Sequence, residues 1–386
     1  MYDMRILFIN RMLSIERGGG ETFDLEISRH IEKLGHEVSY LSGLPLLAGA
    51  RTPIAHPRSH TLRSPYFGWF PWDKVRGGWR LRYLDFYLFQ RAVVRWVRRH
   101  ANGFTVLQVC ELPEFVRWWK QAGGGIPVVI RLTAPNFYDP KGGVGMADAR
   151  IASGMSLREL HQRGMTSVYD IPNCVDTDMF RPHPNDFRRQ HKIGSREFVC
   201  VYVARFQAFK NHAMLLRAFA RFAKDCPESR LILAGSGPLQ PMVRAQALEA
   251  GLVERVIFLG EVAYSDLPAM YAAANMFTIT SDYESFCFAA LEAMATELPV
   301  VTTDCGWVPR LVQNGRGGLI VPVNDDEAFA VAMIRLAGNP ALRAEQGRIN
   351  RNYVETNYRW ENSAKKMVAI YEQIARRDVE PDSRDR

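Results

Sequence analysis

Residues 277–312 constrain the fold of this chain more than any other stretch of its sequence. Two short runs of β-prone apolar residues, 277–280 and 300–303, lie on either side of a segment, 286–295, that is rich in Ala and contains no Gly or Pro. Short apolar runs of this kind favour buried strands, and the segment between them favours a helix. The stretch therefore predicts a strand, a helix and a second strand.

Two glutamates bracket the predicted helix: Glu284 precedes its first turn and Glu292 lies inside it. Eight helical residues rise about 12 Å, which is roughly the reach needed to hold both ends of a sugar–diphosphate–ribose. The amides and the dipole at the helix start favour a phosphate group, and we expect Ser281 or Asp282 to cap that end. In this interpretation Glu292 accepts hydrogen bonds from a ribose and Glu284 from a hexose. Taken alone, the same pattern also fits two solvated side chains.

Residues 283–309 resemble the E-x7-E signature of retaining glycosyltransferases of the GT-B fold, family 4 in particular. Both glutamates, the small apolar helix and the following strand match that signature together. The resemblance implies that Glu284 faces the donor sugar, as a catalytic residue, and that Glu292 faces the ribose. The backbone amides that we expect at the phosphates and the sugar are those of Ser285, Phe286 and Cys287.

The resemblance extends over nearly the whole chain of 386 residues and implies its fold class. That class is α/β, a GT-B fold of two Rossmann-like domains that face each other across a cleft. We expect an N-terminal, acceptor-side domain in residues 1–168 and a C-terminal, nucleotide-sugar-binding domain in residues 169–356. A terminal helix, residues 357–375, is expected to pack back on the first domain, and residues 376–386 are predicted to be disordered.

Two positions depart from the family pattern. The family usually carries Glu after the proline of a Gly-Gly-x-Pro-Glu turn, whereas this chain has Arg310, which we expect to alter donor preference. Where many members read Arg-Leu-His-Thr-Pro, residues 131–135 have Thr133 in place of the histidine. That difference suggests an unusual acceptor or weaker turnover. Glu111 and Glu114 resemble a family loop at a strand end, and the sequence leaves open whether they face the cleft or solvent.

The N-terminal residues predict a strand, a glycine loop and a helix, in that order. Residues 5–10 are apolar and β-prone, three glycines follow, and residues 21–34 have a helical pattern. This arrangement offers backbone amides to a phosphate, although glycines also serve ordinary tight turns. By resemblance, Gly19 and Gly20 lie beside the donor phosphates and the acceptor. Further strands are expected at 36–41, 106–109 and 126–132, and a further helix at 81–99.

Two cations are expected at the equivalent place in the second domain. Residues 198–204 predict a strand that leads into Arg205, and Lys210 opens a helix over 213–224. Arg205 and Lys210 match the family's pair that clamps the donor diphosphate, and we assign both a catalytic role. They would neutralise the charge that develops on the leaving group without a metal. Two more turns expected at the nucleotide follow the strands 231–234 and 256–260, at Gly235 and Val262.

We expect no bound metal, and no cofactor besides the nucleotide sugar as co-substrate. Asp176, Thr177 and Asp178 form a D-x-D, which a metal-dependent glycosyltransferase would use to hold Mg²⁺ or Mn²⁺. The motif lies in the predicted linker rather than after a buried strand, so we assign it no metal. The six cysteines have no C-x-x-C spacing, which favours reduced thiols in a cytosolic protein.

The net charge of +8 comes from the first 175 residues, which hold 23 Lys and Arg against 15 Asp and Glu. A basic surface attracts nucleic acid, anionic lipid or an anionic substrate alike. No nucleic-acid-binding module is recognisable, and we expect no nucleic-acid partner. The aromatic stretch that precedes residue 81 either contacts an anionic membrane peripherally or belongs with the next helix to the core of the first domain. Its aromatic residues are Tyr66, Phe67, Trp69, Phe70 and Trp72.

The chain has no uncharged apolar run of 18 residues, and its first residues enter a strand without a signal-peptide pattern. We therefore expect a cytoplasmic protein, at the inner face of the plasma membrane where it meets lipid. The predicted activity is transfer of a hexose, with retention, from a UDP- or GDP-sugar to a glycan, lipid-linked or small-molecule acceptor in bacterial surface polysaccharide or glycoconjugate biosynthesis. Two alternatives remain: a catalytically inactive binding subunit of a glycan-assembly complex, and a sugar-nucleotide epimerase.

Overall fold

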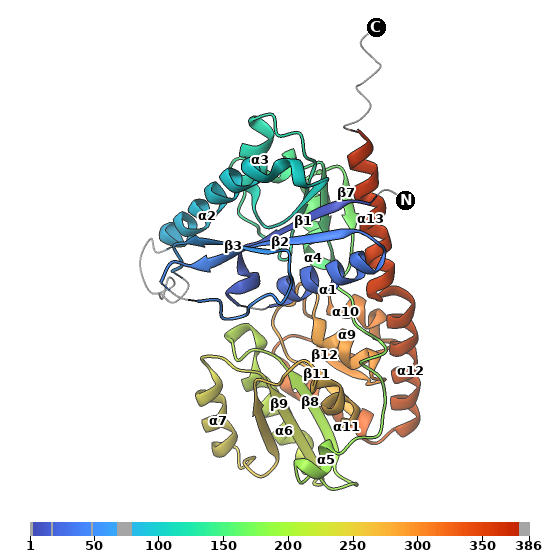
Figure 1. Cartoon of the computed structure of the whole chain (residues 1–386). Helices are drawn as coiled ribbons and strands as arrows, with labels where there is room; N and C mark the ends of the chain where they lie inside the picture. The colour runs from blue at the N-terminus through green and yellow to red at the C-terminus, as the bar shows by residue number, and fades with distance from the viewer. Residues whose placement is uncertain (1–2, 17, 48, 68–78, 378–386) are drawn as a thin grey trace. The chain divides into compact units, whose positions relative to one another are not determined.

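The computed structural model describes residues 3–16, 18–47, 49–67 and 79–377, and the chain divides into two compact units (Figure 1). The first unit comprises Met1–Pro172 and Trp360–Arg386, and the second comprises Asn173–Arg359. The chain thus enters the second unit after Pro172 and leaves it after Arg359. The boundaries expected from the sequence, after residues 168 and 356, lie a few residues earlier in both cases.

Within the described residues, the first unit contains a seven-stranded parallel sheet in the order β3-β2-β1-β4-β5-β6-β7. Its central strands are almost wholly buried runs of Val, Ile and Leu, as expected where helices cover both faces of a parallel sheet. The strand order reverses between β1 and β4, which makes that place the switch point of a doubly wound fold. The strands are β1 (Arg5–Asn10), β2 (Glu37–Pro45), β3 (Ser59–Ser64), β4 (Val106–Cys110), β5 (Val128–Arg131), β6 (Ala149–Ala152) and β7 (Val168–Asp170).

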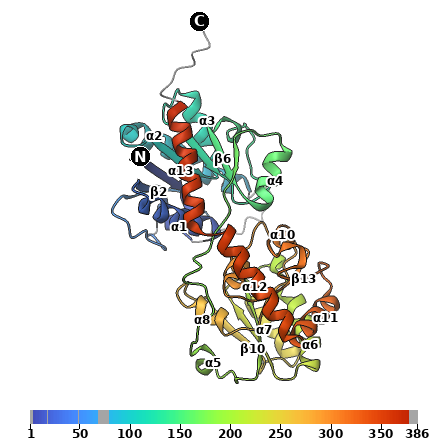
Figure 2. The ribbon, with the colours of Figure 1, turned by 90° about the vertical axis from the view of Figure 1, so that its right-hand side faces the viewer.

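The helices of the first unit are α1 (Gly19–Lys33), α2 (Trp79–His100), α3 (Pro113–Gln121), α4 (Gly154–Gln162) and α13 (Trp360–Arg377). The terminal helix α13 packs along α1 (Figure 2), where the rings of Trp360 and Phe23 lie 5.6 Å apart. Its Tyr371 hydroxyl donates a hydrogen bond of 2.9 Å to Gln108 of β4. Helix α13 therefore contributes to the core of the first unit. The helix continues through Arg377, two residues into the predicted tail.

The second unit contains, within the described residues, a six-stranded parallel sheet in the order β10-β9-β8-β11-β12-β13. This order repeats that of the first sheet, with its switch point between β8 and β11. The strands are β8 (Phe198–Val203), β9 (Ser229–Ala234), β10 (Val256–Gly260), β11 (Met276–Ile279), β12 (Val300–Thr303) and β13 (Gly318–Val321). The helices are α5 (Phe187–Gln190), α6 (His212–Asp225), α7 (Gln240–Glu249), α8 (Leu267–Ala272), α9 (Phe288–Ala295), α10 (Val308–Leu311), α11 (Asp326–Ala337) and α12 (Pro340–Asn357).

The predicted fold class is confirmed: both units are α/β, Rossmann-like and built on parallel sheets. Strands β1, β10 and β12 have the predicted bounds, and the other predicted elements differ by one to four residues at an end. The sequence did not reveal β3, β6, β7 or β13. Strand β3 is a polar, partly exposed edge strand, β7 has only three residues, and β6 contains a charged arginine among its four. Strand β13 is an apolar run that the sequence interpretation missed.

No helix among the described residues is both long enough and apolar enough to cross a bilayer. Of the aromatic stretch predicted to meet a membrane, Trp69, Phe70 and Trp72 lie outside the described residues. Tyr66 lies under the guanidinium of Arg11 at 5.5 Å, and the Phe67 amide donates to the Asp85 carboxylate at 3.0 Å. The two described aromatic residues are therefore anchored to the first unit.

Candidate functional site

The carboxyl ends of β8 and β11 meet at the switch point of the second sheet, where folds of this kind bind ligands. After β8 the chain passes Arg205 and a short 3-10 helix that ends at Lys210 before it enters α6. After β11 it passes Glu284 and enters α9. Two residues that are 74 positions apart, Lys210 and Glu284, thereby come into contact.

Lys210 and Glu284 form an ion pair, with Nζ 2.5 Å from Oε1. Glu284 is only 7% exposed, and the same oxygen accepts a hydrogen bond of 2.7 Å from the Ser281 hydroxyl. The Tyr202 hydroxyl of β8 lies 3.0 Å from that of Ser281 and donates to the Lys210 carbonyl at 2.9 Å. The buried carboxylate is thus oriented by groups that follow two neighbouring strands.

A turn after β12 holds the backbone of Glu284. The Trp307 amide donates to the Glu284 carbonyl at 3.1 Å, and a Cβ added at Gly306 would lie 2.0 Å from the same oxygen. Gly306 also has a φ of +57°, so the turn needs glycine for both reasons. Arg310, which replaces the family's glutamate, is exposed on α10 and lies over the Trp307 ring at 4.8 Å. Its effect on donor preference stays a prediction.

The predicted cap of α9 is wrong. The helix begins at Phe288 with Cys287 as its N-cap residue, and no side chain caps it. Ser281 binds Glu284 instead, and Asp282 accepts a hydrogen bond of 2.9 Å from the Asn211 side chain. Cys287 has a φ of 83°, in the left-handed region that residues other than glycine rarely adopt. The turn therefore enters α9 through a strained residue rather than a capping side chain.

The amides of Ser285, Phe286 and Cys287 donate to no acceptor among the residues that the structure describes. The Phe286 side chain is buried against the ring of Tyr358, at 5.9 Å, which fixes the loop. Three backbone donors therefore lie together at the start of a helix and beside the cation of Lys210. This is a favourable environment for an anion.

Glu292 lies inside α9 and is 6% exposed. The Tyr271 hydroxyl of α8 donates to its Oε2 at 2.8 Å. Burial raises the pKa of Glu292 to about 7, although the Tyr271 hydrogen bond partly opposes this shift. The carboxyl is therefore held in one orientation and changes protonation near neutral pH. Neither predicted glutamate is a solvated surface side chain.

The remaining predicted residues of the second unit lie on turns at the same edge of the sheet. Gly235 follows β9 with a φ of +133°, and a Cβ there would lie 2.1 Å from the Ala204 carbonyl. Its amide donates to the Gly260 carbonyl at 2.7 Å, two residues before the half-buried Val262. These contacts lock the turn that carries the exposed Arg205 to the turns after β9 and β10.

His212, the first residue of α6, adds no positive charge at neutral pH. Burial, assisted by the charge of Lys210, lowers the pKa of His212 to about 4. Its ring stacks on that of Phe206 at 4.2 Å. The histidine therefore acts as a neutral packing group beneath the turn that carries the two cations.

The D-x-D motif is a turn. Asp176 accepts hydrogen bonds of 2.9 Å from the amides of Asp178 and Met179, which satisfies one of its carboxylate oxygens within the linker. Across the described ranges, no three His, Cys, Asp or Glu side chains are grouped so as to hold a metal ion.

In the first unit, Gly19 and Gly20 begin α1, with Gly18 as its N-cap residue. The Glu21 carboxylate accepts from the Gly18 amide at 2.9 Å and from the Asn10 side chain at 3.2 Å. A negative charge therefore already occupies the start of this helix. The loop offers less to a phosphate than the start of α9 does, and the roles assigned to Gly19 and Gly20 stay predictions.

Asp24 and Arg131 connect this loop to β5. Arg131 donates to the Gly20 carbonyl at 3.1 Å and lies 3.4 Å from Asp24 Oδ1, while Asn10 donates to Asp24 Oδ2 at 2.8 Å. Burial raises the pKa of Asp24 to about 6, and the charge of Arg131 works against that shift. The glycine loop is thus held by a buried polar network.

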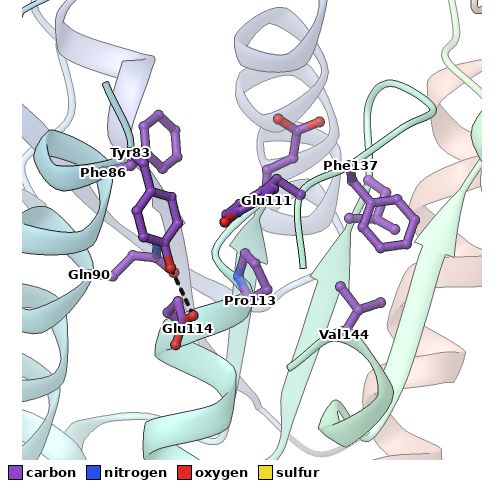
Figure 3. A pocket seen from close by; sticks show the side chains of 10 residues that line it. Tyr83, Phe86, Gln90, Glu111, Pro113, Glu114, Phe137 and Val144 are labelled. Carbon is purple, nitrogen blue, oxygen red and sulfur yellow. Dashed lines mark hydrogen bonds between the residues drawn. The ribbon is translucent and has the colours of Figure 1, made fainter. Parts of the chain in front are cut away.

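Glu111 is half-buried and Glu114 is buried, and both are held by hydrogen bonds within the first unit. The amide and the hydroxyl of Thr133, the residue in place of the family histidine, both donate to Glu111 Oε1, the amide at 3.0 Å. Glu114, 3% exposed, accepts from Arg117 at 2.8 Å and from the Tyr83 hydroxyl at 3.0 Å. Both acids line a cavity of about 320 Å³ that lies wholly within the first unit (Figure 3).

Residues 184–353 match the family model described as glycosyl transferases group 1, and this match lies within the second unit. The second unit is a group 1 glycosyl transferase domain. It contains Arg205, Lys210, Glu284 and Glu292, so the family resemblance inferred from the sequence is confirmed.

Several curated proteins are related in sequence. Over 210 residues the chain is 29% identical to the GDP-mannose-dependent alpha-(1-6)-phosphatidylinositol monomannoside mannosyltransferase of Mycolicibacterium smegmatis, which covers 52% of this chain and 55% of that protein. The chain thus spans about half the length of this relative. A longer match, over 377 residues at 22% identity, joins 94% of the chain to 95% of the N-acetyl-alpha-D-glucosaminyl L-malate synthase of Bacillus anthracis.

Solved structures support the fold of the whole chain. Sucrose-phosphate synthase from Thermosynechococcus elongatus superposes with a TM-score of 0.80 at 21% identity, over 96% of this chain and 99% of that one. Anabaena HepE, solved in complex with UDP and glucose, superposes with a TM-score of 0.73 at 20% identity, over 96% and 100% of the two chains. At these identities the likeness concerns the fold alone, which is that of GT-B glycosyltransferases.

The sequence interpretation missed several residues that shape the group 1 domain's candidate site. Tyr271 lies in an apolar run, Met270–Tyr271–Ala272, that reads as ordinary core. Ser281 was taken for a helix cap. Gly306 was not singled out, because its close approach to Glu284 depends on a contact between separate segments. A positive φ is not visible in a sequence, but a glycine after a buried strand is a usable signal for one.

Proposed function

We propose that this chain is a retaining, metal-independent glycosyltransferase that moves a hexose from a UDP- or GDP-sugar to a glycan, lipid-linked or small-molecule acceptor. The observation that carries the proposal is the Lys210–Glu284 pair beside the unused amides of residues 285–287. A cation, a helix start and an oriented carboxylate together match a phosphate next to a sugar. The names of the relatives, which include a GDP-mannose-dependent enzyme and a structure with UDP and glucose, agree with this donor class.

In this proposal the donor diphosphate binds the amides at the start of α9 and the side chains of Arg205 and Lys210. Lys210 then exchanges part of its contact with Glu284 for the phosphate, and Glu284 accepts hydrogen bonds from the hexose hydroxyls. Glu292, held by Tyr271, accepts a hydrogen bond from the ribose. The ion pair seen between Lys210 and Glu284 thus preorganises both groups for the donor.

The proposed reaction proceeds on one face of the sugar. The bond from C1 to the diphosphate oxygen breaks and its electron pair leaves on that oxygen. The acceptor hydroxyl oxygen bonds to C1 from the same side, and its proton passes to the departing phosphate oxygen. Glu284 is already engaged by Lys210 and Ser281, which argues against a role as covalent nucleophile. Arg205 and Lys210 supply the charge that the leaving group requires.

A donor screen tests the proposal. The protein is incubated with UDP-glucose, UDP-galactose, UDP-N-acetylglucosamine and GDP-mannose, with a mixed acceptor panel, and released nucleoside diphosphate is measured. We expect release from at least one donor, and its loss in Lys210→Ala. Absence of release from every donor together with tight binding of UDP or GDP would favour the second candidate, an inactive binding subunit. Thr133 and Arg310, which replace family residues, are the observations that support that candidate.

We also propose that the protein acts at the cytoplasmic face of a bacterial membrane, in surface polysaccharide or glycoconjugate synthesis. Support comes from the basic first unit, in which Arg91, Arg95 and Arg99 lie exposed along one side of α2. Arginines on an exposed helix attract anionic headgroups. Flotation with vesicles that contain phosphatidylglycerol, at low salt, should bring the protein to the lipid layer, and flotation with phosphatidylcholine alone should not.

A further inference from the structure

We infer that the cavity of the first unit is an acceptor subsite that takes an aromatic or branched apolar group, with Glu111 holding a hydroxyl at its rim. The inference rests on the proposed function, because it assigns the acceptor of that reaction. It is carried by three separate observations: the chemistry of the cavity wall, the geometry of Glu111 and the rigidity of the surrounding loops.

The cavity wall is apolar. Tyr83 and Phe86 of α2 lie on one side, Phe137 and Val144 lie on the other, and Pro113 lies between them (Figure 3). The rings of Tyr83 and Tyr138 meet edge to face at 4.9 Å. A volume of about 320 Å³ holds roughly ten non-hydrogen atoms at about 30 Å³ each. This is the size of a substituted ring or of two isoprene units.

Several acceptor oxygens deep in the cavity are already engaged within the protein. Glu114 is bound by Arg117 and by the Tyr83 hydroxyl, and Gln90 Oε1 accepts from the Phe115 amide at 3.0 Å. A bare carbohydrate in this cavity would lose more hydrogen bonds to water than the few remaining polar groups of the wall could replace. An apolar group has no hydrogen bonds to water to lose, and burying its surface in the cavity is favourable. The wall therefore selects against an unsubstituted sugar.

Glu111 supplies the one unsatisfied polar atom that the argument needs. Its Oε1 accepts from Thr133, whereas its Oε2 has no donor among the described residues. In Figure 3 its carboxylate is directed away from Pro113 and Glu114. Glu111 follows β4 with a φ of +53°, a strained value for a glutamate. A carboxylate that is oriented by Thr133 and has one open oxygen is suited to accept a hydrogen bond from an acceptor hydroxyl.

The position of Glu111 places that hydroxyl at the switch point of the first sheet. Thr133, which holds Glu111, lies next to the glycine loop: a Cβ added at Gly20 would be 3.3 Å from the Thr133 methyl group. The apolar group would thus bind beside α2 while the hydroxyl binds near α1. The acceptor class that fits is a hydroxyl compound whose apolar substituent lies within a few bonds of that hydroxyl.

The cavity is preformed, because the loop over it is held at several points. Asp139 accepts hydrogen bonds of 2.8 Å from the amides of Gly143 and Val144, and Glu159 accepts one of 2.6 Å from the Asn136 amide. A Cβ at Gly143 would lie 1.9 Å from the Pro113 carbonyl, so the loop packs directly on the cavity floor. A rigid cavity of this kind binds its occupant without a large entropic cost for ordering the surrounding loop and side chains.

Saturation-transfer NMR tests the inference without requiring turnover. The probes are 4-nitrophenyl glycosides of glucose, mannose, galactose and N-acetylglucosamine, each paired with its methyl glycoside. We expect saturation of the nitrophenyl protons for at least one sugar, and at least tenfold weaker binding of the matching methyl glycoside. Val144→Phe and Phe86→Trp fill the cavity from opposite sides and should abolish the signal. The matched control, Val253→Phe at an exposed position of the second unit, should retain it.

Glu111→Gln separates the role of the carboxylate from that of the cavity. Gln keeps an oxygen for Thr133 but replaces Oε2 by a donor, so we expect about tenfold weaker probe binding with an unchanged melting temperature. Binding of UDP or GDP, measured on the same samples, should be unaffected in all of these variants, and this separates failure of the inference from failure of the proposed function. Equal binding of methyl glycosides, binding that survives in both filled variants, or no binding of any nitrophenyl glycoside would overturn the inference.

Discussion

The two units place a glutamate at the same point of the same topology and surround it differently. Glu284 follows β11 and Glu111 follows β4, so each lies across the switch point from the first strand of its sheet. Glu284 is paired with Lys210 beside unused amides, whereas Glu111 is bound by the neutral Thr133 beside an apolar cavity. The helices that follow these glutamates differ in the same sense, because α3 carries Glu114 in its first turn whereas the first turn of α9 has no acid. One edge is suited to an anion, and the other to a neutral hydroxyl compound.

The largest effect on turnover should follow from removing the cation of Lys210 at the switch point of the second unit's sheet. Lys210→Ala should lower turnover by at least about 100-fold, because the charge on the leaving group is no longer neutralised. The control is Lys224→Ala, an exposed lysine on α6, which should keep wild-type turnover. Nucleoside diphosphate release measures both. Unchanged turnover in Lys210→Ala, with melting temperatures within a few degrees, would refute the clamp.

The next effect concerns the turn that holds Glu284. Gly306→Ala should destabilise the second unit by about 2–4 kcal/mol and weaken donor binding, since its Cβ would overlap the Glu284 carbonyl and its φ is positive. Gly251→Ala is a matched control, because Gly251 has a similar φ of +68° and no atom within 4 Å of the added Cβ. It should cost only about 1 kcal/mol. If denaturant unfolding shows equal losses of unfolding free energy in the two variants, the close approach of Gly306 to the Glu284 carbonyl is unimportant.

A pH series sharpens the comparison through the buried carboxyl of Glu292. Its pKa in the folded protein, about 7, lies above the ordinary value of 4.5, so the folded state binds its proton more tightly than the unfolded state. The resulting stability is full below pH 4.5 and is lost as the pH rises through 7, by up to about 3 kcal/mol. In Glu292→Gln this decrease in stability between pH 4.5 and 7 should be absent. Parallel pH profiles of unfolding for wild type and variant would contradict the assignment.

The smallest effect on activity should come from a change at the switch point of the first unit's sheet, beside Glu111. Thr133→Val removes the hydroxyl that donates to Glu111 but keeps the amide that does the same. We expect the acceptor KM to rise a few-fold with little change in kcat, and the affinity for nucleoside diphosphate to stay the same. A loss of donor affinity in this variant would show that Thr133 serves the donor and not the acceptor.

The sequence predicted those strands and helices whose formation depends on a local pattern of residues. Strands such as β1, β10 and β12 are short runs dominated by β-prone residues, and their bounds follow from composition alone. The polar edge strand β3 has no such pattern, because one of its sides faces water. The start of α9 was misplaced by two residues, since Ser281 looks like a cap and its true partner, Glu284, is reached only when the loop folds back.

The candidate sites required information that no single segment contains. The contact between Lys210 and Glu284 spans 74 residues. The family resemblance assigned both residues to the donor but did not predict that they pair. The contact between Glu111 and Thr133 lies where that resemblance breaks, so nothing in the sequence predicted it. Departures from a family pattern are thus the positions at which the structure adds most.

Hydrogen–deuterium exchange with and without UDP or GDP tests the central claim most directly, because it reports which edge binds the donor. We expect slower exchange in the peptides that contain residues 282–290 and 204–212 of the second unit, and no change in the first-unit peptides that contain residues 108–116 and 131–140. Protection confined to the first unit, or none with either nucleotide at millimolar concentration, would contradict the account.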